Sequence, residues 1–297
     1  MSQTLVKDAI IKERPKLSES SVKTYTSILN SLHSKIFGKG VDTHLDDFKE
    51  TKKILDFLKD VPPNRRKTTM SALVILTNEK PYRDQMNEDV LDYNHQISKQ
   101  ECTETQKDNW VTPEHIRSVF NDLEHNAGIL YKKKNLKPID LQAIQDYIMM
   151  SVSSGIYIPP RRLVDWCSFK LKDVNKQEDN YLDKNTLVFN KYKTAKFSGQ
   201  QTVECPKDLK VILTKWSKFN PTPYLLFDTN MNPLNPVKLN QRFNKIFGAK
   251  VCVYNFRDSF LTAKFGHILE QKKQVDETMK DMGSSSSMLD TYVKKGV

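Results

Sequence analysis

Two arginines, a lysine and a tyrosine in the second half of the chain are of types that could together act on a phosphodiester. Arg162 lies in SGIYIPPRRLVDWCSFKLKDV, Lys193 in NKYKTAKFSG, Arg257 in VYNFRDSFLTAKF and Tyr292 in MGSSSSMLDTYVKKGV. Attack on a phosphodiester places negative charge on its non-bridging oxygens, and two guanidiniums can bind that charge bidentately. A tyrosine hydroxyl, whose pKa in peptides is about 10, becomes a nucleophile once deprotonated, and a lysine can protonate the departing oxygen. These residue types therefore indicate phosphoryl transfer through a covalent phosphotyrosine.

In this order, the four residues and their surroundings resemble the tyrosine recombinase family, the phage-integrase-like enzymes that break and join DNA. The resemblance spans about residues 18–297. In that family the first arginine begins a helix and is followed by acids three and eleven residues later, which matches Arg162, Asp165 and Asp173. The apolar positions of the same frame are filled by Leu163, Trp166, Phe169 and Leu171. Arg161 offers an alternative register, but its offsets to the two acids do not fit, so the frame favours Arg162.

The lysine and second-arginine motifs match the family in part. The catalytic lysine of the family lies on a β-hairpin turn, commonly as Lys-Thr before another basic residue, which the stretch Lys193–Lys196 (KTAK) reproduces. Lys191 and Lys196 are the alternatives. Most members read His-x-x-Arg around the second arginine, whereas this chain has Tyr254 in place of the histidine before Arg257.

The last motif of the family normally holds Leu-Gly-His, with the tyrosine nine residues beyond that histidine. Here Ser284 occupies the histidine position and Tyr292 follows eight residues later. A hydroxyl can still hydrogen-bond a phosphate oxygen, so Tyr254 and Ser284 are working substitutes or marks of lost activity. The resemblance implies that Tyr292 attacks, that Lys193 is the general acid, and that the two arginines stabilise the transition state. It implies no metal and no other cofactor.

Each of these residues also has an ordinary structural interpretation. Arg162 could be a solvated arginine at a helix start, and Arg257 could form a structural ion pair on a helix face. Lys193 is one of 38 lysines, and a tyrosine such as Tyr292 usually packs. His267 lies where the family uses no histidine and is expected at the surface. The ordered combination, rather than any single residue, favours the catalytic interpretation.

The charge of the chain indicates a polyanionic partner. The 297 residues carry a formal net charge of +11, and residues 112–297 hold 29 basic against 19 acidic side chains. A basic cluster also opens a predicted helix of the first half, where phosphate binding and simple capping are alternatives. We expect double-stranded DNA as the partner and no membrane association; the candidate DNA-binding residues are Arg65, Arg66, Lys67, Lys191 and Lys196.

Hydrophobic periodicity predicts the elements that position these residues. Helices are expected over 18–37, 45–58, 67–76, 88–96, 140–153, 208–216, 236–247, 254–269 and 273–282, with one starting at Thr112 and a short segment near 288–293. Residues 185–189 and 201–205 predict a β-hairpin with a lysine-rich turn. The polar stretch 96–111 predicts a linker. The expected fold is mainly α with two domains: a helical core-binding domain over 1–95, and a helical catalytic domain with a small β-sheet over 112–297.

The resemblance implies a site-specific recombinase or integrase that acts as a tetramer on two DNA sites. A type IB topoisomerase or hairpin-telomere resolvase would use similar residues, and a catalytically impaired DNA-binding protein would keep only the scaffold. An unrelated basic helical scaffold is the remaining alternative. The excess of lysine over the 9 arginines suggests a viral or mobile element of an AT-rich genome. No C-x-x-C pair or export signal is present, so an intracellular protein is expected, in the host nucleus or cytoplasm if viral.

Overall fold

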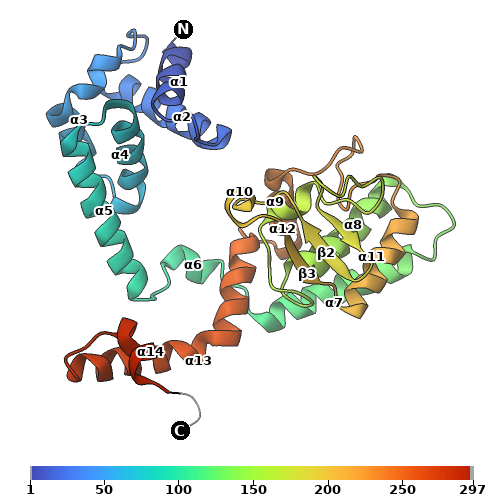
Figure 1. Ribbon diagram of the computed structural model, residues 1–297. Helices are drawn as coiled ribbons and strands as arrows, with labels where there is room; N and C mark the ends of the chain where they lie inside the picture. The colour runs from blue at the N-terminus through green and yellow to red at the C-terminus, as the bar shows by residue number, and fades with distance from the viewer. Residues whose placement is uncertain (1, 295–297) are drawn as a thin grey trace. The chain divides into compact units, whose positions relative to one another are not determined.

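The computed structural model describes residues 2–294, and the chain divides into two compact units, Met1–Thr103 and Glu104–Val297 (Figure 1). Both units are mainly helical, and the described strands form one three-stranded antiparallel sheet in the second unit. The predicted fold class, mainly α with a small sheet, is confirmed. Among residues 2–294, no helix combines the length and the apolar composition needed to cross a bilayer.

The first unit contains six helical elements around an apolar core. They are α1 (Ser2–Glu13), α2 (Glu19–Ile36), the 3-10 helix η1 (Leu45–Lys49), α3 (Thr51–Leu58), α4 (Pro63–Thr77) and α5 (Lys80–Ser98). Local signals account for several starts: the Ser18 side chain accepts a hydrogen bond from the Ser21 amide at 3.2 Å, and Pro63 occupies the first turn of α4. In the core, the hydroxyl of buried Tyr82 donates to the Phe48 carbonyl at 2.8 Å.

Three features of this part of the chain differ from the sequence-based expectations or were not expected. Helix α1 was not predicted, although its buried Val6 and Ile10 are four residues apart, the spacing of one helix face. The predicted helix 45–58 is divided at Glu50, whose backbone (φ −70°, ψ 63°) leaves the helical region. The predicted linker 96–111 is partly helical, because α5 continues to Ser98 and α6 (Glu104–Asp108) lies within it.

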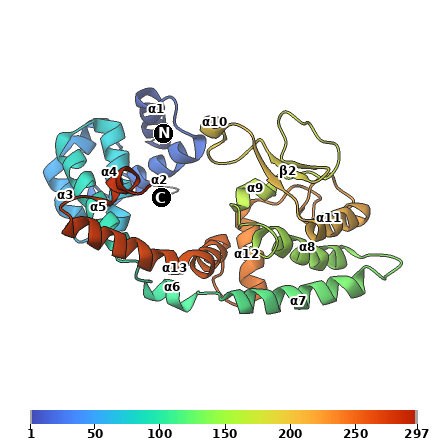
Figure 2. The same cartoon turned by 60° about the horizontal axis from the view of Figure 1, so that its bottom comes forward.

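In the second unit, helices lie to one side of the small sheet (Figures 1 and 2). After α6 come α7 (Pro113–Leu130), α8 (Pro138–Ser153) and α9 (Leu163–Cys167). The sheet has the order β1-β2-β3, formed by β1 (Tyr181–Asp183), β2 (Thr186–Phe189) and β3 (Gln201–Glu204), and α10 (Ala195–Ser198) lies in the β2–β3 loop. The chain ends with α11 (Lys207–Phe219), α12 (Pro236–Phe247), α13 (Val253–Asp281), η2 (Ser286–Met288) and α14 (Leu289–Tyr292).

An aromatic cluster packs α9 against the sheet. Trp166 and Phe169 have ring centroids 5.3 Å apart, and each ring also contacts Phe189 of β2, at 5.3 and 5.8 Å. All three side chains are fully buried. Because β2 and α9 share this core, the residues at the start of α9 are held in a defined position relative to the hairpin. The predicted hairpin is present, with Phe189 opposite Gln201.

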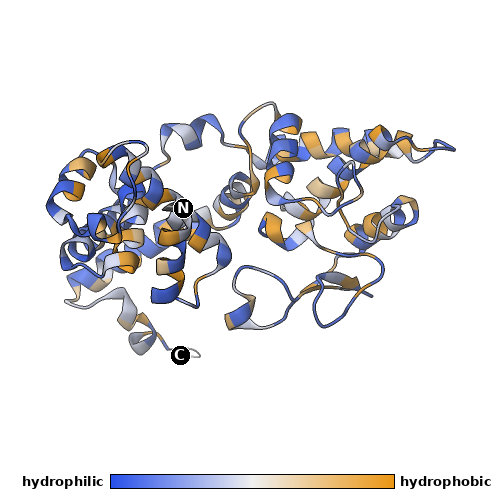
Figure 3. Ribbon diagram, turned by 90° about the horizontal axis from the view of Figure 1, so that it is seen from above, coloured by the Kyte–Doolittle hydropathy of each residue, from blue (hydrophilic) through white to orange (hydrophobic). Residues whose placement is uncertain are grey.

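Helix α13 differs from the expectation of two helices over 254–269 and 273–282. It is one continuous helix of 29 residues, because the stretch between the predicted halves, EQK (270–272), consists of good helix formers and contains no proline. Beyond its first turns most of its side chains are exposed, including Leu261, Phe265 and Ile268. Figure 3 shows orange and blue residues alternating along the helices, as amphipathic helices require.

Candidate active site

Arg162 stands at the N-cap of α9. The preceding Pro159-Pro160 cannot extend a helix from α8, and Arg162 has extended backbone angles (φ −64°, ψ 147°) before α9 begins at Leu163. Its side chain is half-buried and, within residues 2–294, forms no hydrogen bond or ion pair. A guanidinium with free donors at the edge of the core is available to an anion.

The charges of Arg162 and Arg257 both act on the carboxylate of Asp165, which is 2% exposed. Burial raises the pKa of Asp165, and the charges of three arginines counteract that rise: Arg161, Arg162 and Arg257. Oδ2 of Asp165 accepts a hydrogen bond from Arg161 Nε at 2.9 Å, whereas Oδ1 has no partner among the described residues. The charges of the two predicted catalytic arginines therefore act on the same acid.

Gly155 allows this approach of α13 to the segment before α9. It has a φ of +91°, and a Cβ at this position would lie 2.9 Å from the ring of Phe260 on α13 and 3.2 Å from Pro160. Only glycine combines that backbone angle with that close packing. Arg257, three residues before Phe260 on α13, is thereby placed beside the segment that ends in Arg162.

Tyr254 lies on the exposed side of α13 next to Arg257. Its ring centroid is 6.0 Å from the Arg257 guanidinium carbon, and its side chain is 60% exposed. Asp258, the neighbour of Arg257, has a pKa raised by burial and held down by that arginine. The structure therefore places the predicted substitute for the first histidine beside Arg257, with its hydroxyl in solvent.

Lys193 lies in the loop between β2 and β3 and is exposed, with no ion pair among the described residues. Its two alternatives are partly engaged: Lys191 lies 3.8 Å from the Glu178 carboxylate, and Lys196 lies 4.8 Å from the ring centroid of Phe197. Lysines on a solvent-exposed loop can reach a phosphate without breaking buried contacts. Of the three lysines, Lys193 is the one with no ion pair or ring contact among the described residues.

Two side chains connect this loop to α9, and the sequence did not reveal their role. Fully buried Asn180 donates to the Asp165 carbonyl at 2.9 Å and to the Lys191 carbonyl at 2.7 Å, and accepts from the Lys191 amide at 2.7 Å. Arg161 donates to Gln201 Oε1 on β3 at 3.1 Å in addition to Asp165. Asn180 sits in a polar stretch without periodicity, so only tertiary structure identifies it.

Tyr292 and Ser284 are not brought to the arginines. Asp281, the last residue of α13, is 24 positions beyond Arg257, which corresponds to about 36 Å along the helix axis at 1.5 Å per residue. The Ser284 amide donates to the Met279 carbonyl at 2.8 Å, so the chain turns at the end of α13. Tyr292 follows in α14 with a 55% exposed side chain. The predicted site is therefore divided between the two ends of α13.

The three basic residues predicted to bind DNA in the first unit differ in their contacts. Arg66, predicted to bind DNA, instead contacts Asp89 through Nε at 3.1 Å and Nη2 at 2.7 Å, and its Nη1 donates to the Lys59 carbonyl at 2.8 Å. Asp89 is fully buried, so Arg66 is occupied by neutralising it. Arg65 is exposed, and Lys67 lies 2.9 Å from the ring centroid of Tyr93.

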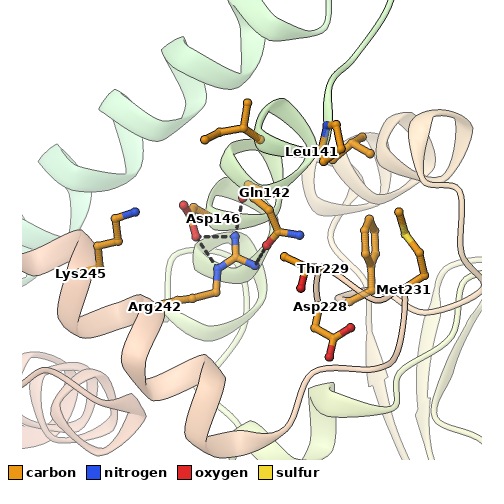
Figure 4. A pocket seen from close by; sticks show the side chains of 11 residues that line it. Leu141, Gln142, Asp146, Asp228, Thr229, Met231, Arg242 and Lys245 are labelled. Carbon is orange, nitrogen blue, oxygen red and sulfur yellow. Dashed lines mark hydrogen bonds and ion pairs between the residues drawn. The ribbon is translucent and has the colours of Figure 1, made fainter.

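A cavity of about 400 Å³ lies elsewhere in the second unit, lined by residues of α8, α12 and the segment 227–231 (Figure 4). Arg242 dominates it, donating through Nε to Asp146 at 2.8 Å and through Nη1 to Gln142 at 3.1 Å. Burial raises the pKa of Asp146, and Arg242 opposes this rise. None of the predicted site residues lines this cavity, and its arginine is satisfied by the protein.

The sequence matches no family model and no curated protein. Among solved structures, a lambda integrase dimer bound to a COC′ core site matches with 13% identity and a TM-score of 0.48, covering 91% of this chain and 72% of that one. The XerA recombinase matches with 12% identity and a TM-score of 0.35, covering 88% and 83%. The chain is similar in structure to these recombinases. A lambda integrase tetramer bound to a Holliday junction matches with 12% identity and a TM-score of 0.44, covering 89% and 69%. At these values the likeness concerns the arrangement of elements and not activity or any residue's role.

Proposed function

We propose that this protein is a site-specific DNA recombinase or integrase that cleaves and rejoins double-stranded DNA through a covalent 3′-phosphotyrosine. The observation that carries this proposal is that α13 packs at Phe260 against Gly155, in the segment that leads to Arg162, so that Arg162 and Arg257 both act on buried Asp165. Two permanently charged groups, neither of which forms a hydrogen bond or ion pair with residues 2–294, suit a scissile phosphate. The exposed hairpin loop adds Lys193 at the edge of the sheet that packs on α9.

In the proposed reaction, Tyr292 Oη bonds to phosphorus after losing its proton, and the bond between phosphorus and the 5′ oxygen breaks. Arg162 and Arg257 bind the non-bridging oxygens as their charge grows. Lys193 donates the proton that the departing 5′ oxygen takes up. Because the phosphotyrosine conserves the energy of the phosphodiester, a 5′ hydroxyl can reverse the attack and rejoin DNA without ATP.

Tyr254 and Ser284 assist in this scheme from the positions that the related enzymes fill with histidine. Tyr254 can donate its exposed hydroxyl to a phosphate oxygen next to Arg257. Ser284 belongs to the segment that carries Tyr292 and would arrive with it. Asp165 and Asp173 orient and support rather than react.

The reaction requires Tyr292 to approach a pair of arginines from which it is separated in this structure. Either α13 bends within its exposed middle, which returns Tyr292 to the arginines of its own chain, or another copy supplies the tyrosine. Few buried side chains fix the distal part of α13, so bending there exposes little new apolar surface. We favour bending within one chain.

The proposed partner is double-stranded DNA, and the proposed assembly is a tetramer on paired sites. The helical first unit would contact the duplex through Arg65 and Lys67, and the second unit through Lys191 and Lys196. Arg65, Lys191 and Lys196 are exposed and Lys67 is half-buried, whereas Arg66 is held in an ion pair with buried Asp89. A viral or mobile-element origin would fit the composition.

The test is covalent trapping. The protein is incubated with nicked duplex or four-way junction DNA that carries the termini of its own element, and adducts are resolved on a denaturing gel. The parent is expected to form an adduct that Tyr292→Phe abolishes, Tyr254→Phe reduces and the matched control Tyr224→Phe leaves unchanged. An adduct that persists in Tyr292→Phe would remove the assigned nucleophile. Strand transfer between paired sites separates a recombinase from a topoisomerase or telomere resolvase.

A second candidate is a DNA-binding protein that uses a recombinase scaffold without cleavage. The observation that favours it is the separation of Tyr292 and Ser284 from the arginines. It predicts tight, salt-sensitive DNA binding with no adduct on nicked, intact or branched substrates. Binding of that kind that is unchanged in Tyr292→Phe would support this candidate.

A further inference from the structure

Arg161 connects two elements that carry different parts of the proposed site. On α9, its Nε donates to Asp165 Oδ2 at 2.9 Å. On β3, its Nη2 donates to Gln201 Oε1 at 3.1 Å. Its guanidinium carbon also lies 3.9 Å from the ring centroid of Phe189 on β2, and its side chain is 17% exposed. Unlike Arg162, it is enclosed and fully engaged by protein groups.

The two sheet residues that Arg161 contacts are those that close the loop holding Lys193. Phe189 ends β2, Gln201 begins β3, and the two are paired in the antiparallel register. Arg161 therefore holds both ends of the loop 190–200 relative to Asp165, the acid around which the arginine pair gathers. The guanidinium suits this task because it is planar: its face stacks on a ring while its edges donate in two directions.

The fold of the loop does not depend on Arg161 alone. Asn180 independently binds the Lys191 backbone, and the Tyr192 hydroxyl donates to the Gly199 carbonyl at 2.7 Å. Loss of Arg161 would therefore release the Gln201 end of the loop from Asp165, while Asn180 keeps the Lys191 end bound to α9 and the loop folded. A displacement of about 1 Å is enough to reduce a catalysed rate by about 100-fold.

We propose that Arg161 is a positioning residue that holds Lys193 where it can protonate the departing 5′ oxygen. This role rests on the proposed function, in which Lys193 is the general acid. It also assigns distinct tasks to the adjacent arginines: Arg162 binds the phosphate, and Arg161 acts through the lysine loop. Gln201 shares the task, because it is the part of β3 that Arg161 holds.

A change of leaving group separates these tasks. The test compares DNA whose scissile linkage has an ordinary 5′ oxygen with DNA that has sulfur in that bridging position. An alkoxide must be protonated as it leaves, whereas a thiolate leaves without a proton, since thiols have a pKa of about 8.5. A variant that has lost only the general acid is therefore slow with oxygen and restored with sulfur. A variant that has lost an arginine clamp is slow with both.

We expect Lys193→Ala to slow adduct formation on the oxygen substrate by about 10²-fold or more. Arg161→Lys and Gln201→Ala should slow it by about tenfold to 100-fold. Sulfur should bring all three within about threefold of the parent, whereas Arg162→Ala should stay slow. Gln201→Ala keeps the contact between Arg161 and Asp165, so it tests the link to the loop with the arginine pair undisturbed.

Equal slowing of Arg161→Lys on both substrates would overturn the proposal and assign Arg161 to the phosphate or to the general fold. Melting temperatures of the same variants detect a loss of fold. If the parent forms no adduct with either substrate, the proposed function fails. The connection that Arg161 makes between Asp165 and the loop 190–200 is then tested by amide hydrogen exchange. Faster exchange over 190–200 in Arg161→Lys supports this connection, and unchanged exchange contradicts it.

Discussion

Two pairs of adjacent arginines follow Pro-Pro dipeptides in this chain, Arg65-Arg66 and Arg161-Arg162. In each pair one guanidinium forms an ion pair with a buried carboxylate, and the other forms no ion pair among the described residues. Arg66 is held by Asp89, and Arg161 is held by Asp165. The enclosed arginine is the second of the pair Arg65-Arg66 but the first of the pair Arg161-Arg162. Residue type and local sequence therefore do not tell which arginine of such a pair is available to DNA.

The enclosed arginines also differ in what they join. Arg66 links α4 to α5 and to the end of α3, so its contacts hold helices of one core together. Arg161 links α9 to a hairpin whose loop is solvent-exposed. The first should act on stability and the second on the placement of a reacting group. The variants below are ordered from the largest expected effect to the smallest.

Arg66→Ala should lower the free energy of unfolding by about 3–5 kcal/mol, because it leaves the fully buried Asp89 carboxylate without its partner. Urea unfolding of the full chain measures the change. Arg65→Ala is the matched control and should stay within about 0.5 kcal/mol of the parent, as exposed substitutions usually do. Equal midpoints for the two variants would show that the Arg66–Asp89 contact contributes nothing.

Arg162→Ala should reduce the rate of adduct formation by about 10²–10³-fold, equivalent to about 2.7–4 kcal/mol, by removing a donor to the transition-state oxygens. Its melting temperature should match that of the parent, because the side chain has no partner among residues 2–294. Rates come from the denaturing gel on the oxygen substrate. Normal activity in Arg162→Ala, together with a sulfur-insensitive loss in Arg161→Lys, would exchange the roles of the two arginines.

Gly266→Ala should slow adduct formation by up to about fivefold, because alanine favours a continuous helix over a bent one by about 1 kcal/mol. Gly266 lies in the exposed middle of α13, where a Cβ would only touch Thr262 at 3.9 Å. The matched control is Gly128→Ala in α7, where a Cβ has nothing within 4 Å.

An unchanged rate in Gly266→Ala would favour supply of the tyrosine by a second copy. That route makes its own prediction: a mixture of Tyr292→Phe with Arg162→Ala regains adduct, although neither variant forms it efficiently alone. If α13 bends within one chain, the mixture stays inactive.

Arg65→Ala should leave chemistry intact and weaken DNA binding about equally for all sequences. If Arg65 neutralises one phosphate, the slope of log affinity against log salt falls in magnitude by about 0.9. Affinity titrations between 50 and 200 mM salt, on the order of the range where such slopes are steep, measure it. An unchanged slope would leave both arginines of the first pair without a role in DNA binding.

Local signals predicted the elements that carry the arginines. Thr112 caps α7 by accepting from the His115 amide at 3.2 Å, and Pro236 begins α12 at the predicted residue. The spacing between Arg162 and Asp165 predicted that both lie at the start of a helix. This prediction was possible because a helix start depends on about one turn of local sequence. Strand β3 (Gln201–Glu204) likewise lies within the predicted extended segment 201–205, although Cys205 falls outside it.

Contacts between distant parts of the chain could not be predicted in the same way. The partner of Arg66 lies 23 residues away on another helix, and no spacing rule connects them. Asn180 and Gln201 acquire their importance only once the sheet and α9 pack together. Whether α13 stays continuous or bends depends on the balance between small differences in helix propensity and the packing of its distal part. The sequence around Gly266 allows both conformations.

The length of α13 has a consequence for how often the DNA of a host would be broken. About 36 Å, the separation along α13 between Arg257 and its end, is roughly one turn of B-form DNA. The phosphate held by the arginines of a chain and the phosphate within reach of its Tyr292 would therefore be different phosphates. In the proposed reaction, a copy that scans a genome leaves the strands intact until α13 bends, so the frequency of unwanted breaks follows the rate of that bending rather than the number of encounters with DNA.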